Sequence, residues 1–152
     1  MMIDAARGYA SPAWTNDYIG IPFRDLGRDR SGLDCWGLAR LVLAEQFGIT
    51  VPSFSENYTR TDERHLLSRV IDREASHWIE VGRGRAAIGK ERLGDVVTFR
   101  HEGFESHIGI VINPKTWRML HARIGSDSVD SCYNETRYKH QICRFLRHQS
   151  RA

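Results

Sequence analysis

The chain has 152 residues, which is enough for one domain with a well-packed core and too few for two such domains. Its 41% hydrophobic and 27% charged residues are typical of a globular protein and exclude wholesale disorder. A net charge of +3 is too small to indicate nucleic-acid binding, although a weakly basic surface suits an anionic polymer.

The first part of the chain predicts an arm, a helical turn and an extended approach to the first long helix. Residues 1–13 form the arm, which lacks the apolar core of a secretory signal, and no stretch approaches membrane-spanning length. We therefore expect a chain made in the cytoplasm without insertion into a membrane. Residues 14–18 predict the helical turn, residues 20–23 the extended segment, and residues 26–32 a polar loop.

The first long helix is expected to run from Asp34 to about Phe47, with Gly48 ending it. Asp34 is a good N-cap, and Cys35 follows it at the first helical position. Unpaired N–H groups and the positive end of the helix dipole favour a thiolate there, so Cys35 is predicted to have a lowered pKa and to be nucleophilic. A buried structural cysteine is the alternative that this position alone leaves open.

The rest of the chain predicts a second helix and then strands. Residues 61–76 have a helix-period apolar stripe and a charged opposite face. Helices followed by strands indicate an α+β fold, with an antiparallel sheet and helices packed to one side, in a single domain over residues 1–152. The expected strands are residues 78–81, 96–99, 107–112, 117–121 and 138–146, and residues 147–152 are expected to form a frayed basic tail.

Two of the seven histidines stand at positions suited to catalysis. His107 opens the most apolar predicted strand, and His121 closes the next one. A thiolate nucleophile needs a base, and the base needs a group that orients it, so Cys35, His107 and His121 form a candidate triad. If His107 opposes His121, the hairpin between them must contain an odd-length loop or a bulge for the two imidazoles to share a sheet face.

Two alternatives to this triad stay open. The three residues could be a structural thiol and two unrelated histidines at the rim of the core. One cysteine and two histidines are also zinc ligands, although their spacing matches no usual zinc motif. Cys132 and Cys143 complete an odd count of three cysteines without a CxxC pair, so no disulfide framework is encoded. We expect neither a metal nor a cofactor.

Several segments resemble motifs of the NlpC-type cell-wall cysteine peptidases. Residues 32–38 (GLDCWGL) are similar to the family's Asp-Cys-small-Gly-aliphatic signature, and residues 94–99 (GDVVTF) to its Gly-Asp strand. Residues 106–110 (SHIGI) resemble the strand that carries the base, and residues 120–122 (LHA) the segment with the orienting residue. Residues 18–23 are like the segment before the nucleophile.

The resemblance spans most of residues 18–125 and implies a papain-like fold, in which the helix that carries the cysteine packs on an antiparallel sheet. It implies hydrolysis of an amide bond in the peptide stem of peptidoglycan, often between D-glutamate and a diamino acid. Cys35 would be the nucleophile, His107 the base and His121 the orienting residue. The residues expected to bind the substrate or the oxyanion are Tyr18, Phe23, Asp34, Trp36 and Ser106, and three arginines could pair with stem carboxylates, namely Arg24, Arg28 and Arg30.

The sequence departs from the family pattern near the oxyanion site. Many members have a tyrosine near the position of Phe23, and its hydroxyl helps to stabilise the oxyanion. Phe23 cannot donate a hydrogen bond, so this role is expected to fall to the backbone N–H of Cys35 or to Tyr18. The missing hydroxyl also supports a rival prediction, a structural or assembly protein that keeps the peptidase fold.

A second departure indicates where the protein acts. Trp36 stands where most members have serine, and together with residues 27–30 (GRDR) it resembles the branch found in tailed phages and gene transfer agents. This resemblance implies a place in a virion tail tip, contacts with other tail or baseplate proteins, and action on peptidoglycan in the periplasm or cell wall of a target cell. Amide chemistry on a substrate outside the wall is a further alternative, and no nucleic-acid partner is expected.

Overall fold

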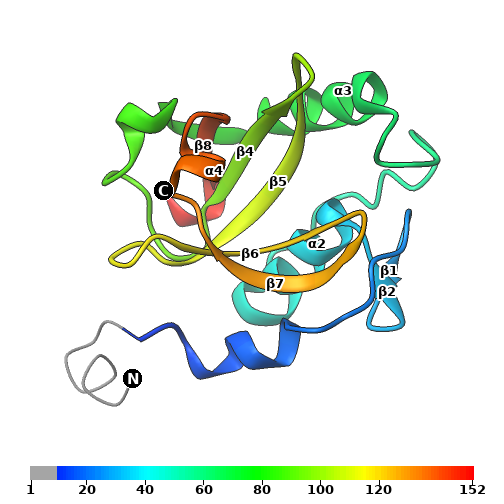
Figure 1. Cartoon of the computed structure of the whole chain (residues 1–152), viewed down its shortest axis with the longest axis horizontal. Helices are drawn as coiled ribbons and strands as arrows, with labels where there is room; N and C mark the ends of the chain where they lie inside the picture. Colours follow the sequence, from blue (N-terminus) through cyan, green and yellow to red (C-terminus); the bar gives the residue numbers. More distant parts are fainter. Residues whose placement is uncertain (1–9) are drawn as a thin grey trace.

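The computed structural model describes residues 10–152, so most of the predicted N-terminal arm, residues 1–9, lies outside the described part of the chain (Figure 1). The elements in chain order are η1 (Ala13–Tyr18), β1 (Arg28–Asp29), β2 (Gly32–Leu33), α2 (Cys35–Phe47), α3 (Arg64–Ala75), β3 (Trp78–Arg83), η2 (Arg85–Ala87), β4 (Val96–His101), β5 (Phe104–Asn113), β6 (Arg118–Arg123), β7 (Ser126–Cys132), α4 (Thr136–Lys139), β8 (Ile142–His148) and η3 (Gln149–Arg151).

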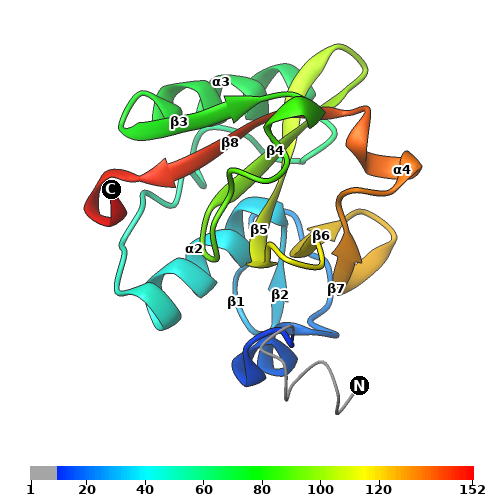
Figure 2. The ribbon, with the colours of Figure 1, turned by 90° about the vertical axis from the view of Figure 1, so that its left-hand side faces the viewer.

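The centre of the fold is a six-stranded sheet with the order β3-β8-β4-β5-β6-β7, in which every neighbouring pair is antiparallel. The long helices α2 and α3 pack on it, with α3 against β5 and β3 and α2 against β5 and β6 (Figures 1 and 2). This is the predicted α+β, papain-like arrangement. No helix within residues 10–152 is long and apolar enough to cross a membrane.

Alternating side chains of the strands build a core on each face of the sheet. Ile108, Ile110 and Ile112 of β5 pack with the buried residues of α2 and α3. Val111, between them in sequence, belongs to a second core, which also contains Phe145 of β8 and residues of η2 and α4. Because both faces are covered, β5 reads as a nearly continuous apolar run.

The helix α2 begins and ends as the sequence predicts. Asp34 has extended backbone angles and its carboxylate accepts a hydrogen bond from the N–H of Gly37, while Gly48 ends the helix in the left-handed conformation at φ 66°. Gly37 also allows close packing, because a Cβ there would lie only 2.0 Å from the carbonyl oxygen of Gly27. The glycine therefore lets the first turn of α2 contact the preceding loop.

The strands of the C-terminal third differ from the prediction in two places, and its tail in a third. Residues 126–132 form the edge strand β7, which has a mostly polar sequence and so gives no apolar alternation to detect. The predicted strand 138–146 starts only at Ile142, because Thr136–Lys139 forms the short helix α4.

The predicted frayed tail is wrong. Strand β8 continues to His148, and Arg147 donates two hydrogen bonds to the fully buried carboxylate of Asp95. An ion pair of this kind holds the chain end because a buried carboxylate without a partner is costly.

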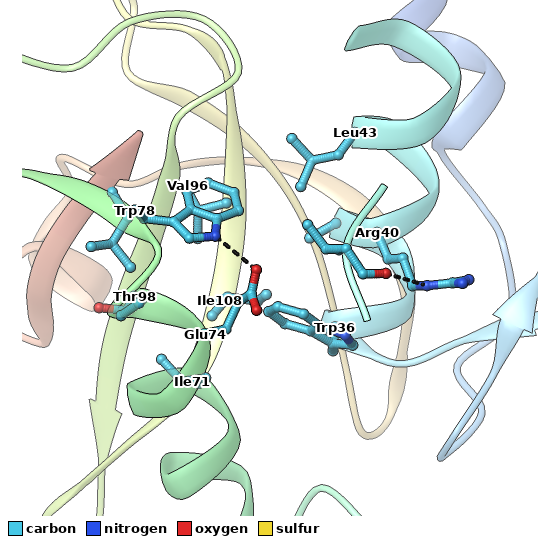
Figure 3. Close-up of a pocket in the computed structure, with 13 residues that line it drawn as sticks. Trp36, Arg40, Leu43, Ile71, Glu74, Trp78, Val96, Thr98 and Ile108 are labelled. Atoms are coloured by element: carbon cyan, nitrogen blue, oxygen red, sulfur yellow. Dashed lines mark hydrogen bonds between the residues drawn. The ribbon is translucent and has the colours of Figure 1, made fainter. Parts of the chain in front are cut away.

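A small apolar cavity of about 20 Å³, enough for one water molecule, lies between α2, α3 and the sheet (Figure 3). Trp36 and Leu43 face it from α2, and Ile108 from β5. Glu74 of α3 reaches into it and accepts a hydrogen bond of 2.9 Å from the indole N–H of Trp78. The cavity is part of the packing between the layers.

Candidate active site

Cys35 lies at the first position of α2, as predicted, and is 3% exposed. The backbone N–H groups of Trp36 and Ile108 lie close enough to its sulfur to favour the thiolate and so act to lower its pKa. Ile108 directly follows His107 in strand β5. The start of α2 is therefore fixed against the part of the sheet that carries the candidate base.

The two predicted histidines form a hydrogen-bonded pair. Nε2 of His107 lies 2.9 Å from Nδ1 of His121, and Nε2 of His121 lies 2.9 Å from Oγ of Ser131 on β7. The rings pack against two aromatic residues, His107 against Phe99 and His121 against Tyr138. The result is a continuous chain of polar groups, His107–His121–Ser131, across β5, β6 and β7.

The hairpin that joins the histidines contains the predicted bulge. Ile110 pairs with Leu120 and Val111 with Met119, and the register then shifts before Asn113. Odd-numbered residues of β5 therefore share a sheet face with odd-numbered residues of β6, and this places both imidazoles on the same side. Direct opposition of His107 and His121 is wrong, however: the register places them diagonally, and the long imidazole side chains span that offset.

The electrostatics at Cys35 differ from the prediction. Burial, together with the negative charge of Asp34, raises the pKa of the thiol to about 12, which outweighs the hydrogen bonds from the backbone N–H groups. Desolvation and then the neighbouring His121 lower the pKa of His107 well below 6.5. The resting pair at neutral pH is therefore a thiol and a neutral imidazole, because desolvation disfavours both charged forms.

His121 is also held neutral. Burial and the positive charges of Arg123 and Arg137 lower its pKa to about 4, and its side chain is 1% exposed. For His107 to accept a proton at Nδ1, its Nε2–H must donate to Nδ1 of His121. The Nε2–H of His121 then donates to the hydroxyl of Ser131.

A buried polar network fixes Asp34, which directly precedes Cys35. Its carboxylate accepts hydrogen bonds from the guanidinium of Arg28 at 2.8 Å, the hydroxyl of Tyr58 at 2.5 Å and the backbone N–H of Leu26 at 3.0 Å, besides that of Gly37. Arg28 also donates to the oxygen of Tyr58 at 2.8 Å. Tyr58 could not be predicted as part of this network, because it comes from a loop between α2 and α3.

Two of the arginines predicted to meet the substrate have partners within the chain. Arg28 belongs to the Asp34 network, and Arg30 forms an ion pair with Glu45 at 2.9 Å. Arg24 places its side-chain carbons against Gly32, with its Cβ 2.6 Å from the position of a Cβ there. The first two guanidinium groups therefore act in loop structure.

The other predicted site residues separate into two groups. The hydroxyl of Tyr18 bonds Glu45 and Gln46, near the opposite end of α2 from Cys35, so it is not placed to meet an oxyanion at the thiol. Trp36 is buried and its indole N–H donates to the carbonyl of Pro52, which directs it away from any substrate. Phe23 and Ser106 lie beside His107 and line a cleft with it.

This cleft has a volume of about 190 Å³, which corresponds to roughly a dozen water molecules. His107 lies on its wall and is mostly buried. The cleft is therefore large enough for part of a peptide next to the candidate base. The residues that line it are Phe23, Thr61, Arg64, His101, Ser106, His107, Ala122, Arg123 and Ile124.

The zinc alternative finds no support in the geometry. Among residues 10–152, no three His, Cys, Asp or Glu side chains lie together in a group that could hold a metal ion. Cys35, Cys132 and Cys143 are all free thiols.

A cysteine-bearing helix packed on an antiparallel sheet is the arrangement found in papain-like folds. The chain belongs to the NlpC/P60 family, whose model matches residues 20–147. It is 26% identical over 136 residues to the murein DD-endopeptidase MepS/murein LD-carboxypeptidase of Escherichia coli K12, a match that covers 90% of this chain and 60% of that protein. The chain thus spans about three fifths of the length of this curated relative.

Solved structures show the same fold. The NlpC/P60 domain of the peptidoglycan hydrolase SagA superposes with a TM-score of 0.59 at 18% identity and covers 88% of this chain and 92% of its own. An NlpC/P60 family protein from Bacillus cereus ATCC 10987 gives a TM-score of 0.64 at 19% identity, over 92% of this chain and 41% of its own.

Proposed function

We propose that the chain is a cysteine peptidase that hydrolyses an amide bond in the peptide stems of peptidoglycan. The observation that carries this proposal is that the backbone N–H of Ile108, the residue after His107, lies against the sulfur of Cys35, while His107 itself begins the hydrogen-bonded chain His107–His121–Ser131. Membership of the NlpC/P60 family and the similarity to a murein endopeptidase support peptidoglycan as the substrate.

The neutral resting pair sets the first chemical step. His107 accepts the thiol proton at Nδ1 while the sulfur of Cys35 forms a bond to the substrate carbonyl carbon, so charge develops only when substrate is present. The imidazolium then gives that proton to the nitrogen of the leaving amine, the C–N bond breaks, and a thioester remains. Water, deprotonated by His107, hydrolyses the thioester and restores the thiol.

His121 and the start of α2 stabilise this charge. His121 accepts the Nε2–H of His107 and so holds the imidazole in the orientation that proton transfer needs. The backbone N–H of Cys35 lies at the positive end of α2 and is the expected donor to the oxyanion. The hydroxyl of Tyr58 is engaged by Asp34, so it does not replace the hydroxyl missing at Phe23.

Digestion of purified sacculi tests the function directly. We expect the wild-type protein to release soluble stem-peptide fragments, identified by mass spectrometry, and Cys35→Ala to release none above background. Cys132→Ala is the matched control, because it removes a free thiol outside the site and should keep full activity. Undiminished release by a folded Cys35→Ala variant would refute the mechanism.

A structural role in a phage or phage-like tail tip is the second candidate. The buried, protonated thiol and the absence of a hydroxyl at Phe23 favour it, as does the Trp36 branch resemblance. The sacculus experiment separates the two functions, because a purely structural component would release no fragments. Co-purification with tail or baseplate proteins from the same particle tests the location independently of activity.

A further inference from the structure

One wall of the cleft beside His107 is basic. Arg64 comes from the first position of α3, Arg123 from the last position of β6, and His101 from the last position of β4. The lining contains no Asp or Glu. Two guanidinium groups from separate elements therefore face one cleft that has no acidic residue of its own.

The two arginines are only weakly neutralised. Arg64 approaches Glu102 at 3.7 Å, and that carboxylate is 75% exposed, so water screens the pair. Within residues 10–152, Arg123 makes no ion pair with a carboxylate. Its charge instead contributes to the lowered pKa values of His101, His107 and His121, which places it close to all three imidazoles.

The position of Arg64 is not explained by helix stability. A cation in the first turn of a helix is opposed by the helix dipole, and Arg64 there is part of no cap. An anion in the cleft would be attracted by both the guanidinium and the N–H groups of this turn. Apolar surface from Phe23 and Ile124 lies beside the charges and suits the aliphatic part of a residue.

We infer that Arg64 and Arg123 form a carboxylate subsite that selects an acidic stem peptide for cleavage beside His107. The inference rests on the proposed function and names its substrate class. A guanidinium binds a carboxylate through two parallel hydrogen bonds, and two such groups on different elements fix both the position and the direction of the peptide. The carboxylate of the substrate replaces Glu102 as the partner of Arg64.

The binding experiment uses the full chain carrying Cys35→Ala, so that peptide is not consumed. The ligand is a stem tripeptide of L-alanine, γ-linked D-glutamate and L-lysine, which has two carboxylates. Three forms are measured by calorimetry: the free acid, the form amidated at D-glutamate, and the form amidated at the C-terminus. Arg64→Gln and Arg123→Gln are compared with Arg73→Gln, an exposed arginine of the same helix α3.

We expect each cleft variant to bind the free acid roughly 10-fold or more weakly, and Arg73→Gln to bind it unchanged. One of the two amidated peptides should bind the Cys35→Ala protein more weakly than the free acid does, by the same factor. Adding a cleft substitution should not weaken the binding of that peptide further. Whichever amide does so identifies the carboxylate that is bound. Arg64→Lys and Arg123→Lys should recover part of the affinity, because the charge is kept.

Three results would overturn the subsite: no measurable binding of the free acid, equal binding of all three peptides, or undiminished binding in both folded glutamine variants. Turnover of sacculi by the wild-type protein is measured in parallel. Cleavage of sacculi without a carboxylate preference in binding would reject the subsite and support the peptidase function. Selective binding without cleavage would support the subsite and reject the peptidase function.

Discussion

At Cys35, desolvation and the helix N-terminus act on the thiol in opposite directions. The sulfur is enclosed by protein and adjoins the carboxylate of Asp34, so the neutral form is favoured although two backbone N–H groups point at it. In the proposed mechanism the side chain is therefore a nucleophile that a general base must activate. Its reactivity depends on His107 and on the substrate that fills the cleft.

The pH profile reports this directly. Because His107 must be neutral to accept the proton and its pKa is lowered, kcat/KM for a stem peptide should stay level from about pH 8.5 down to about pH 6.5 and fall only well below that. Steady-state rates across this range provide the measurement. An activity that instead rises with an apparent pKa near 8.5 would show that thiolate formation, rather than proton transfer to His107, controls the rate.

Arg28 is the second residue whose role follows from burial. Arg28→Met removes the cation beside a carboxylate that is fully buried, so we expect a loss of roughly 3–5 kcal/mol in the free energy of unfolding. Urea denaturation measures this loss. Arg30→Met is the control, because its pair with Glu45 is about half-exposed and should contribute no more than about 1 kcal/mol. Similar losses in the two variants would contradict a special role for the Asp34 network.

The residues of the site differ in how far the sequence reveals them. Cys35, His107 and His121 could be predicted, because each occupies a recognisable position in a helix or strand and in a family motif. Tyr58, Ser131, Arg64 and Arg123 could not, because each comes from a different element and acquires its role only through the tertiary arrangement. The ionisation state of Cys35 was predicted wrongly, since helix position is visible in a sequence and desolvation is not.

At the scale of elements, strands β5, β6 and β7 hold the polar chain His107–His121–Ser131 in place. The bulge in the β5–β6 hairpin sets the parity that brings both rings to one face. Strand β7 supplies the last hydroxyl, and its mostly polar sequence concealed it. The helix α2 was easier to predict, because its cap, its apolar content and its terminal glycine all agree.

These strands should lose stability in acid. The His121 imidazole has a pKa of about 4 in the folded protein and about 6.5 in the unfolded chain. Between about pH 4 and pH 6.5 this imidazole is therefore mostly neutral when the protein is folded and mostly protonated when it is unfolded. The stabilisation is fully present above about pH 6.5 and falls as the pH decreases, by roughly 3 kcal/mol at pH 4.

Urea unfolding at pH 7, 5.5 and 4.5 measures this decrease. His121→Asn should reduce the pH dependence of the unfolding free energy, because it removes one of the two buried imidazoles of the pair. His65→Asn, on the outer part of α3, should keep the dependence of the wild-type protein. An unchanged slope in His121→Asn would place the acid sensitivity elsewhere.

At the scale of the molecule, the order of helices and strands was sufficient to predict an α+β fold with helices on an antiparallel sheet. The sequence could not predict the strand order, in which β8 inserts between β3 and β4, because that pairing joins segments far apart in the chain. It also concealed the anchoring of the C-terminal residues, which depends on the ion pair between Arg147 and the buried Asp95.

The contact between the backbone N–H of Ile108 and the sulfur of Cys35 spans the boundary between the helical half of the chain and its sheet half. Neither half contains both a nucleophile and a base, so the reactive pair exists only after α2 has docked on β5. Under the proposed mechanism, a chain in which only the helices have formed, or in which the two layers have separated, would be inactive. The proposed hydrolytic activity would therefore arise only late in folding, once the helix layer and the sheet have docked.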